Sequence, residues 1–221
     1  NDIYHNEFIH IAPNAHIVTP IHKRIDFKTE EKTDQKIGTT CRGIGPAYVD
    51  KYNRCGIRAL DLMDLEKLKM KVMKRLDDAI ISRDLSDVDR NKIILEIEKF
   101  MEDSSVIAHM VEDTFSMVHE MVSERKNILL EGAQGTMLDI NHGTYPFVTS
   151  SSPSTGGIAT GLGLPLTKVN RIVGIFKAYT TRVGKGPFPT ELFDDDGKKL
   201  QDLGNEYGAT TGRARRCGWF D

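Results

Sequence analysis

Residues 127–132 read NILLEG, a short apolar run that ends at an acidic residue and a glycine. A second run of this kind, IVGIFKAY, occupies residues 172–179. Such runs, bounded by turn-forming residues, are typical of strands that are buried on both faces of a sheet. Residues 149–163, TSSSPSTGGIATGLG, lie between them and are mostly small. We therefore expect an α/β fold with a mainly parallel central sheet, whose ligand-binding loops follow the carboxyl ends of the strands.

Residues 61–123 have the spacing of helices rather than of strands. Side chains recur at intervals of three and four positions in two stripes, and Ser86 with Asp89 predicts a helix start, so that one helix covers about 87–102. We expect a layer of two to four helices inserted before the sheet, in which the methionines fill the core. The stripes are Leu65, Leu68, Val72, Leu76 and Ala79, then Ile107, Met110, Thr114, Met117 and Met121.

The first 58 residues carry weaker signals. The apolar runs at 8–11 and 17–18 suit short strands, and residues 28–37 (KTEEKTDQKI) predict an exposed loop or a frayed helix end. Residues 38–48, GTTCRGIGPAY, hold three glycines and a proline, so we expect a loop there rather than a regular helix.

Composition excludes several classes of protein. The net charge of −2 over 221 residues gives no general attraction to nucleic acid or to membranes. Three scattered cysteines argue against a disulfide framework and a zinc site and favour a reducing compartment, so we predict a cytoplasmic protein. No apolar run is long enough to span a membrane, and the first residues do not resemble a signal peptide. Because the sequence starts without Met and stops after an apolar cluster, we expect it to be part of a longer chain.

Three loops carry candidate binding residues. In residues 38–58 the hydroxyls of Thr39 and Thr40 and the charges of Arg42, Arg54 and Arg58 suit an anion, although a surface loop with scattered basic residues is the alternative.

In residues 131–152, Gln134 can offer a donor and an acceptor to a planar heterocycle, and Thr149 with the serines after it can bind phosphate oxygens. Asp139 and His142 suggest an acid–base pair or metal ligands, but a structural role is the better interpretation of two residues three apart. No GxSxG motif supports a serine nucleophile.

The third loop, residues 208–216, reads GATTGRARR. Arginine suits planar, bidentate binding of carboxylate or phosphate. RNA binding is the alternative, but it would require more basic residues and interleaved aromatic side chains. Neither a GxxxxGK[ST] motif nor a dinucleotide fingerprint occurs. The residues alone therefore predict an α/β domain whose loops bind a small polyanion.

Four segments together resemble the adenylosuccinate synthetase family, in the family's own order. The resemblance implies a sheet of the P-loop NTPase-like type, and it makes 1–221 the central part of a single domain, with a helical block at about 61–123 and the sheet and ligand loops at 127–221. The segments are IGTTCRGIGPAYVDKYNRCGIR, LLEGAQGTMLDINHGTYPFVTSSSPSTGG, IFKAYTTRVGKGPFPTELFD and GNEYGATTGRARRCGWFD.

The resemblance implies a GTP-dependent ligase of purine nucleotide synthesis. In that family the γ-phosphate of GTP is transferred to O6 of IMP, and the amine of L-aspartate then displaces the phosphate at C6. The products are adenylosuccinate, GDP and phosphate, and the substitution is favourable because a phosphate leaves more readily than an oxo group.

Site residues follow from the resemblance position by position. Gln134 is the implied catalytic residue, beside O6 and N1 of the purine. Arg54 is expected to reach the IMP phosphate of a neighbouring subunit, which implies a homodimer, and Arg215 is expected to approach GTP. The implied IMP-binding residues are Thr39, Thr40, Arg54, Gln134, Leu138, Thr149 and Arg213, and the implied aspartate-binding residues are Val183, Ala209, Thr210, Thr211, Gly212, Arg213 and Arg215.

The sequence also departs from the family pattern. Ala214 stands where many relatives carry a basic residue. Cys41 stands where the family often has a glycine or a basic residue. Two parts of the family pattern match nothing here. One is the N-terminal phosphate loop, which supplies the catalytic aspartate and histidine and the Mg²⁺ ligand. The other is the later guanine-selecting segment. We therefore expect Mg²⁺ ligands outside this chain, no metal site within it, and no catalysis by this chain alone. The alternative is a non-catalytic nucleotide-binding or dimerisation module.

Overall fold

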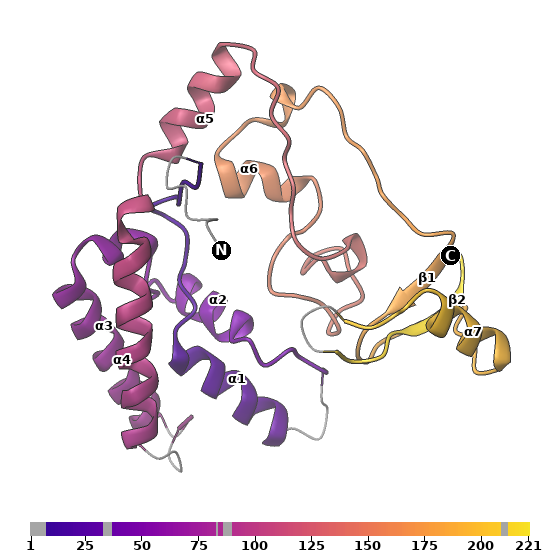
Figure 1. Ribbon diagram of the computed structural model, residues 1–221, viewed down its shortest axis with the longest axis horizontal. Helices are drawn as coiled ribbons and strands as arrows, with labels where there is room; N and C mark the ends of the chain where they lie inside the picture. Colours follow the sequence, from indigo (N-terminus) through magenta and orange to yellow (C-terminus); the bar gives the residue numbers. More distant parts are fainter. Residues whose placement is uncertain (1–7, 33–36, 83, 86–89, 209–211) are drawn as a thin grey trace.

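The computed structural model describes residues 8–32, 37–82, 84–85, 90–208 and 212–221. Three parts can be followed in Figure 1: a group of packed helices on the left, an arm that contains α5 (Thr114–Ser123) and α6 (Gly156–Leu162) at the top, and a pair of strands with α7 (Asp195–Leu203) on the right. A short link after η2 (Ala108–Met110) joins the arm to the packed helices, and a long extended segment joins the arm to β1 (Tyr179–Arg182).

The packed helices contain the main hydrophobic core. The predicted stripe on α3 (Leu65–Ile81) is confirmed, because Leu68, Val72, Leu76 and Ala79 are fully buried while Leu65 lies at the margin. Asp64 caps this helix by accepting a hydrogen bond from the Lys67 N–H. The other elements of this part are α1 (Pro20–Lys32), α2 (Ile44–Tyr52), η1 (Ala59–Met63), α4 (Arg90–Ile107) and η2 (Ala108–Met110).

The second predicted stripe does not form one continuous helix. Helix α4 ends at Ile107, η2 follows, and α5 (Thr114–Ser123) starts anew after Asp113 accepts a hydrogen bond from the Ser116 N–H. Ile11 lies at the interruption, where its N–H donates to the Met110 carbonyl and it forms a bridge with Val111. The predicted start of α4 at Ser86 lies outside the described residues.

The interpretation of the first 58 residues was partly wrong. The runs at 8–11 and 17–18 make single bridges and hydrogen bonds rather than strands. Helix α1 was not predicted, although Pro20 at its first position is a typical start. Helix α2 begins at Ile44, inside the segment expected to be a loop. Pro46 is tolerated there because the first helical turn has no partner for its N–H in any case.

The mainly parallel sheet is not confirmed. The sheet in the described residues is an antiparallel pair, β1 (Tyr179–Arg182) and β2 (Arg216–Trp219), with Tyr179 opposite Trp219. Residues 127–132 and 172–178 are not strands, because no other described segment forms a ladder with them. The remaining elements are η3 (Thr136–Leu138), α6 (Gly156–Leu162), η4 (Leu166–Lys168) and α7 (Asp195–Leu203).

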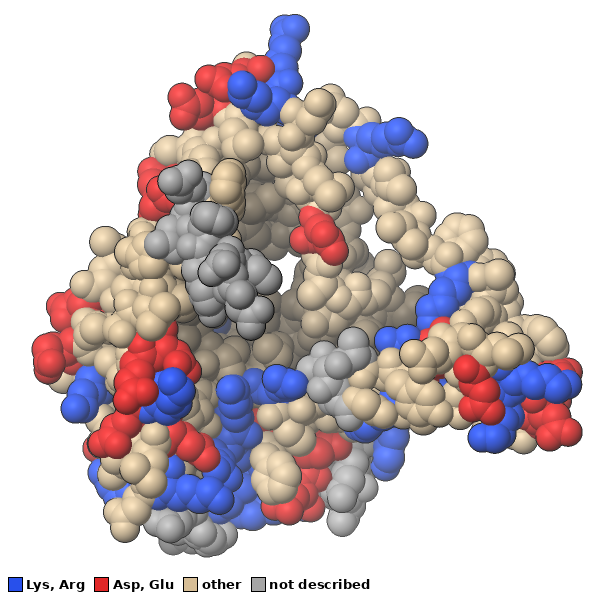
Figure 2. Space-filling model, in the orientation of Figure 1, with Lys and Arg blue, Asp and Glu red and all other residues tan. Residues whose placement is uncertain are grey.

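The two apolar runs that predicted the sheet are exposed. Leu129 is 88% exposed and Ile175 is 96% exposed. The molecule exposes 15303 Å² in all, whereas a compact monomer of this mass exposes roughly 10,000 Å². Figure 2 shows an opening between the helices, the arm and the pair of strands, which adds to the exposed surface. No helix in the described part of the chain is long and apolar enough to cross a membrane.

Candidate ligand-binding site

The loop from Gly38 to Gly43 leads directly into α2. Both glycines have positive φ angles, 83° and 80°, a conformation that other residues rarely adopt. Between them, the Thr39 hydroxyl accepts a hydrogen bond from the Cys41 N–H at 3.3 Å. Cys41 itself has a φ of 52°, a backbone conformation that favours glycine. The loop is therefore a tight, ordered turn in which the Thr40 side chain is exposed.

Three segments that are distant in sequence meet at this loop and the start of α2. A Cβ atom on Gly38 would lie 3.4 Å from Gly184 Cα, and the Arg213 guanidinium donates to the Gly38 carbonyl at 2.8 Å. A Cβ atom on Gly45 would lie 3.7 Å from Ser150 Oγ, next to Thr149. The structure thus brings together the loops of Thr39 and Thr40, of Thr149, of Val183 and of Arg213.

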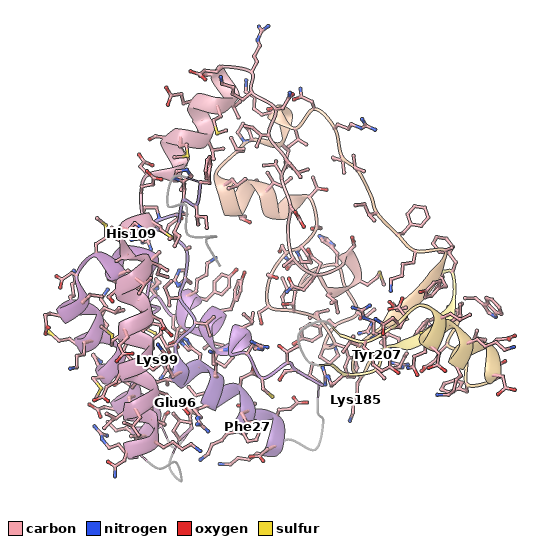
Figure 3. All side chains as sticks on the ribbon, in the orientation of Figure 1. Phe27, Glu96, Lys99, His109, Lys185 and Tyr207 are labelled. Carbon is pink, nitrogen blue, oxygen red and sulfur yellow. The ribbon has the colours of Figure 1, made fainter. Side chains whose placement is uncertain are left out.

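Lys185 also lies at this meeting point, and the sequence analysis did not single it out. Its backbone N is 3.5 Å from the position of a Cβ on Gly38, and its side chain is exposed, as Figure 3 shows. The signal that could have identified it is the sequence VGKG, a lysine between two glycines. The exposed ammonium adds positive charge where an anion is expected.

Arg182 is a second residue that the sequence analysis missed. Its guanidinium donates to Thr144 Oγ1 at 3.0 Å, to the Phe147 carbonyl at 2.9 Å and to the Lys185 carbonyl at 2.9 Å. It therefore fastens β1 to the loop that carries Thr149. Burial and then the nearby charge of Arg216 lower the pKa of Arg182 from its ordinary value.

Asp139 organises the loop of Gln134 and Thr149. Its carboxylate is fully buried and accepts hydrogen bonds from the N–H groups of Asn141 (2.9 Å) and His142 (3.2 Å) and from the Ser154 hydroxyl (2.8 Å). The bond from the Asn141 N–H, followed by that from Ser154, lowers the pKa of Asp139 from 3.8 to about 2. These partners favour the structural role over an acid–base pair. Within the described residues no three His, Cys, Asp or Glu side chains could together hold a metal ion.

The neighbouring arginines of the third loop have different partners. Arg215 Nη1 donates to Glu206 at 2.6 Å, and Arg216 forms a two-point pair with Glu191. Burial opposes the charge of Glu206, yet hydrogen bonds from Lys177, Tyr179 and Arg215 lower its pKa to about 2. Arg213 donates to the Gly38 carbonyl, whereas Arg216 Nη1 donates to the carbonyls of Gly184 at 3.2 Å and Gly186 at 2.9 Å.

The remaining predicted residues are less clustered. Ala209, Thr210 and Thr211 lie outside the described residues, whereas Gly212 is described and has a φ of 64°. Gln134 is exposed with a φ of 68°, and Leu138 is half-buried in η3. Arg54 follows the far end of α2, about 13 Å from Gly43 along a nine-residue helix, so it does not share the site of the other residues.

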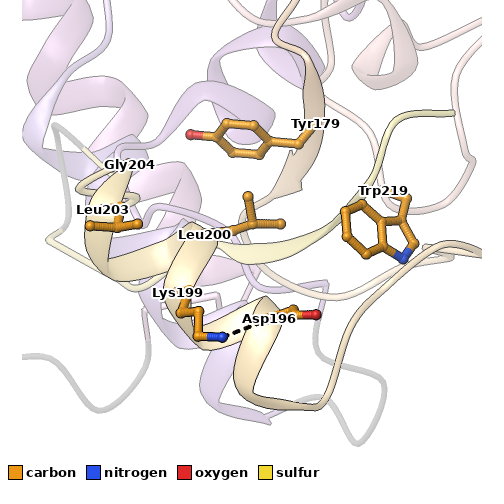
Figure 4. A pocket seen from close by; sticks show the side chains of 7 residues that line it. All are labelled: Tyr179, Asp196, Lys199, Leu200, Leu203, Gly204 and Trp219. Carbon is orange, nitrogen blue, oxygen red and sulfur yellow. Dashed lines mark hydrogen bonds and ion pairs between the residues drawn. The ribbon is translucent and has the colours of Figure 1, made fainter.

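Figure 4 shows a separate hollow beside α7. Its volume is about 460 Å³, and Tyr179, Leu200, Leu203 and Trp219 make its lining largely apolar. It contains no predicted site residue. A second hollow of about 440 Å³ is lined partly by Arg215 and Arg216.

The geometry defines an α/β protein whose loops of Gly, Thr and Arg converge beside a layer of helices. Comparison with known proteins agrees: the family model described as adenylosuccinate synthetase matches residues 1–221. The chain therefore belongs to the adenylosuccinate synthetase family.

Individual relatives show the extent of the similarity. The adenylosuccinate synthetase of Streptomyces coelicolor is 50% identical over 96% of this chain, and that of Lactococcus lactis is 46% identical over 97%. The solved structure of fully ligated adenylosuccinate synthetase from Plasmodium falciparum superposes with a TM-score of 0.91 at 41% identity, covering 98% of this chain and 51% of that one. The chain spans about half the length of the relatives it matches.

Proposed function

We propose that this chain carries the IMP and L-aspartate sites of a GTP-dependent carbon–nitrogen ligase that forms adenylosuccinate in purine nucleotide synthesis. The observation that carries the proposal is the convergence of the Gly38, Ser150, Gly184 and Arg213 segments. Membership of the family supports it, because the matching relatives bear the name of that enzyme.

The IMP site is proposed to run from the Gly38 loop toward the loop of Gln134. The hydroxyls of Thr39, Thr40 and Thr149 would bind the 5′-phosphate, since hydroxyl donors suit phosphate oxygens. Leu138 would pack near the ribose and base. The exposed Gln134 amide would face O6 and N1 of the purine.

The aspartate site is proposed to occupy residues 209–213, Arg215 and the backbone of Val183. Arg213 is the best supported member, because it already lies against the Gly38 loop. It is proposed to contact both the ribose and aspartate. Arg215 keeps further N–H donors besides the one that it gives to Glu206, and it lines the hollow of about 440 Å³. These features suit a residue that also approaches GTP.

The proposed reaction has two steps. The oxygen O6 of IMP attacks the γ-phosphorus of GTP and GDP departs, while the negative charge on O6 is stabilised by the Gln134 amide donor. The aspartate amine then forms the new bond at C6, and the electron pair of the C6–O6 bond leaves with phosphate. The groups that would take the N1 proton and hold Mg²⁺ are proposed to lie outside this chain.

Two further features of the proposal concern the protein as a whole. Arg54, at the exposed far end of α2, would reach the IMP phosphate of a second copy in a homodimer. A cytoplasmic location is supported by the three cysteines, which are all free thiols.

The test is adenylosuccinate formation from IMP, L-aspartate and GTP. We expect turnover by the full-length protein that contains this chain, a loss of about a hundredfold in kcat for Gln134→Ala, and no turnover by the 221 residues alone. Absence of turnover in the full-length protein would refute the ligase and favour the non-catalytic nucleotide-binding or dimerisation module.

A further inference from the structure

Helix α1 presents three polar side chains at intervals of four residues: His22, Asp26 and Glu30. Residues at this spacing share one face of a helix. Each of the three makes a hydrogen bond to the segment that contains the Gly38 loop and α2. The same face of one helix thus supports the whole segment from Gly38 to Asp50.

The two carboxylates hold the two ends of the loop. Glu30 Oε1 accepts from the Gly38 N–H at 2.7 Å, and Asp26 Oδ2 accepts from the Gly43 N–H at 2.8 Å. Hydrogen bonds to ionised acceptors are stronger than those between neutral groups. The segment 39–42, which carries the two threonine hydroxyls, is therefore held at both ends by hydrogen bonds from its flanking backbone N–H groups to α1.

His22 fixes the helix that follows the loop. Its Nδ1 accepts from the Thr19 N–H at 3.0 Å, so the proton lies on Nε2, which donates to Asp50 Oδ2 at 2.9 Å. Asp50 also accepts from Arg75 Nε of α3 at 2.6 Å. His22 and Asp50 are 1% and 3% exposed, so solvent competes little for this network.

The loop packs closely against α1 at Gly43. A Cβ atom on Gly43 would lie 2.7 Å from Lys23 N and 2.8 Å from the His22 carbonyl carbon. The loop end therefore cannot shift toward the helix, and the bond to Asp26 opposes a shift away from it. The position of Gly43 is determined from both sides.

Two carboxylates beside a phosphate-binding loop oppose the binding of an anion unless they have another task. Here both point at backbone N–H groups at the loop ends. We infer that Asp26 and Glu30 are positioning residues, which fix the separation of the loop ends so that Thr39 and Thr40 can bind the phosphate of IMP. This inference rests on the proposed function.

The test compares IMP with inosine, which lacks the phosphate, as ligands of the full-length protein. For Asp26→Ala combined with Glu30→Ala we expect the affinity for IMP to fall about tenfold or more, because two charge-assisted bonds are lost. The affinity for inosine should change less than about twofold, since it makes no phosphate contact. Asp26→Asn combined with Glu30→Gln keeps an acceptor oxygen at each place and should retain IMP affinity within about threefold.

Glu96→Gln provides the matched control. Glu96, labelled in Figure 3, lies on α4 and forms an ion pair with Arg24, which is on α1 like Asp26 and Glu30. The Glu96 side chain does not touch the Gly38 loop. The Glu96→Gln variant should leave the affinities for IMP and for inosine unchanged. Equal losses for IMP and inosine, or an unchanged IMP affinity in the double alanine variant, would overturn the inference. Failure of the wild-type protein to bind IMP would instead contradict the proposed function.

Discussion

At the scale of single residues, the three arginines near the C-terminus show how far identity and spacing determine a role. Arg213 contacts the carbonyl of Gly38, 175 positions away, whereas Arg215 and Arg216 pair with Glu206 and Glu191 of their own region. The sequence presents all three as candidates for an anion. The partners that separate them are brought together only by the tertiary structure, so spacing could not assign the roles.

This difference predicts opposite effects of two substitutions. Arg216→Ala should lower the free energy of unfolding by about 1 kcal/mol, because it breaks a partly exposed pair that joins β2 to Glu191. Arg213→Ala should change stability less and weaken aspartate binding about tenfold or more. Urea denaturation and calorimetric titration of the IMP-bound protein measure the two effects. A reversed pattern would assign the anion-binding role to Arg216.

The low pKa of Asp139 predicts a dependence of stability on pH. A carboxyl group whose folded pKa is about 2, against 3.8 in the unfolded chain, stabilises the fold above pH 4 and loses that contribution as the pH falls toward 2. Wild-type Tm should therefore fall more steeply between pH 5 and pH 2.5 than the Tm of Asp139→Asn. Parallel curves for the two proteins would show that Asp139 does not titrate in this range.

At the scale of elements, the sequence predicted what depends on local periodicity. The stripe of α3 was identified because its buried residues repeat within the helix itself. The strands were predicted from apolar runs, but a strand also requires a neighbour, and the runs at 127–132 and 172–178 have none in the described part of the chain. Candidate loops were recognised by composition, whereas their convergence depends on contacts such as that of Gly38 with Gly184, which no local pattern contains.

The junction of the Gly38 loop with α2 gives an element-scale prediction. Gly43→Ala should destabilise the protein by about 2 kcal/mol or more, because φ is 80° and the new methyl group would collide with the backbone of α1. Gly174→Ala is the matched control, since a Cβ atom there meets nothing within 4 Å. Thermal unfolding of both variants provides the measurement. Equal stability of the two would argue against close packing of Gly43 on the backbone of α1.

At the scale of the whole molecule, stability is concentrated in the helices. The buried cluster lies in the part that contains α1, α3 and α4, while the arm and the part with β1, β2 and α7 expose many apolar side chains. The open shape in Figure 2 adds to the exposed surface. The chain spans about half the length of the relatives it matches, and the apolar side chains of Leu129 and Ile175 are exposed.

This distribution predicts how core and surface substitutions differ in the 221-residue chain. Leu68→Ala should cost about 2–5 kcal/mol, because Leu68 is fully buried. Ile175→Ser should cost less than about 0.5 kcal/mol, because that side chain is 96% exposed. Chemical denaturation compares them. A large loss from Ile175→Ser would show that residues 172–178 are covered in solution.

The central claim is that these converging loops bind IMP, and calorimetric titration of the purified 221-residue chain with IMP tests it most directly. The account predicts saturable binding with one IMP per chain, which inorganic phosphate inhibits and which Thr40→Ala weakens about tenfold. Aspartate should then bind only after IMP. No heat of binding from a folded chain, or binding that Thr40→Ala leaves unchanged, would contradict the account.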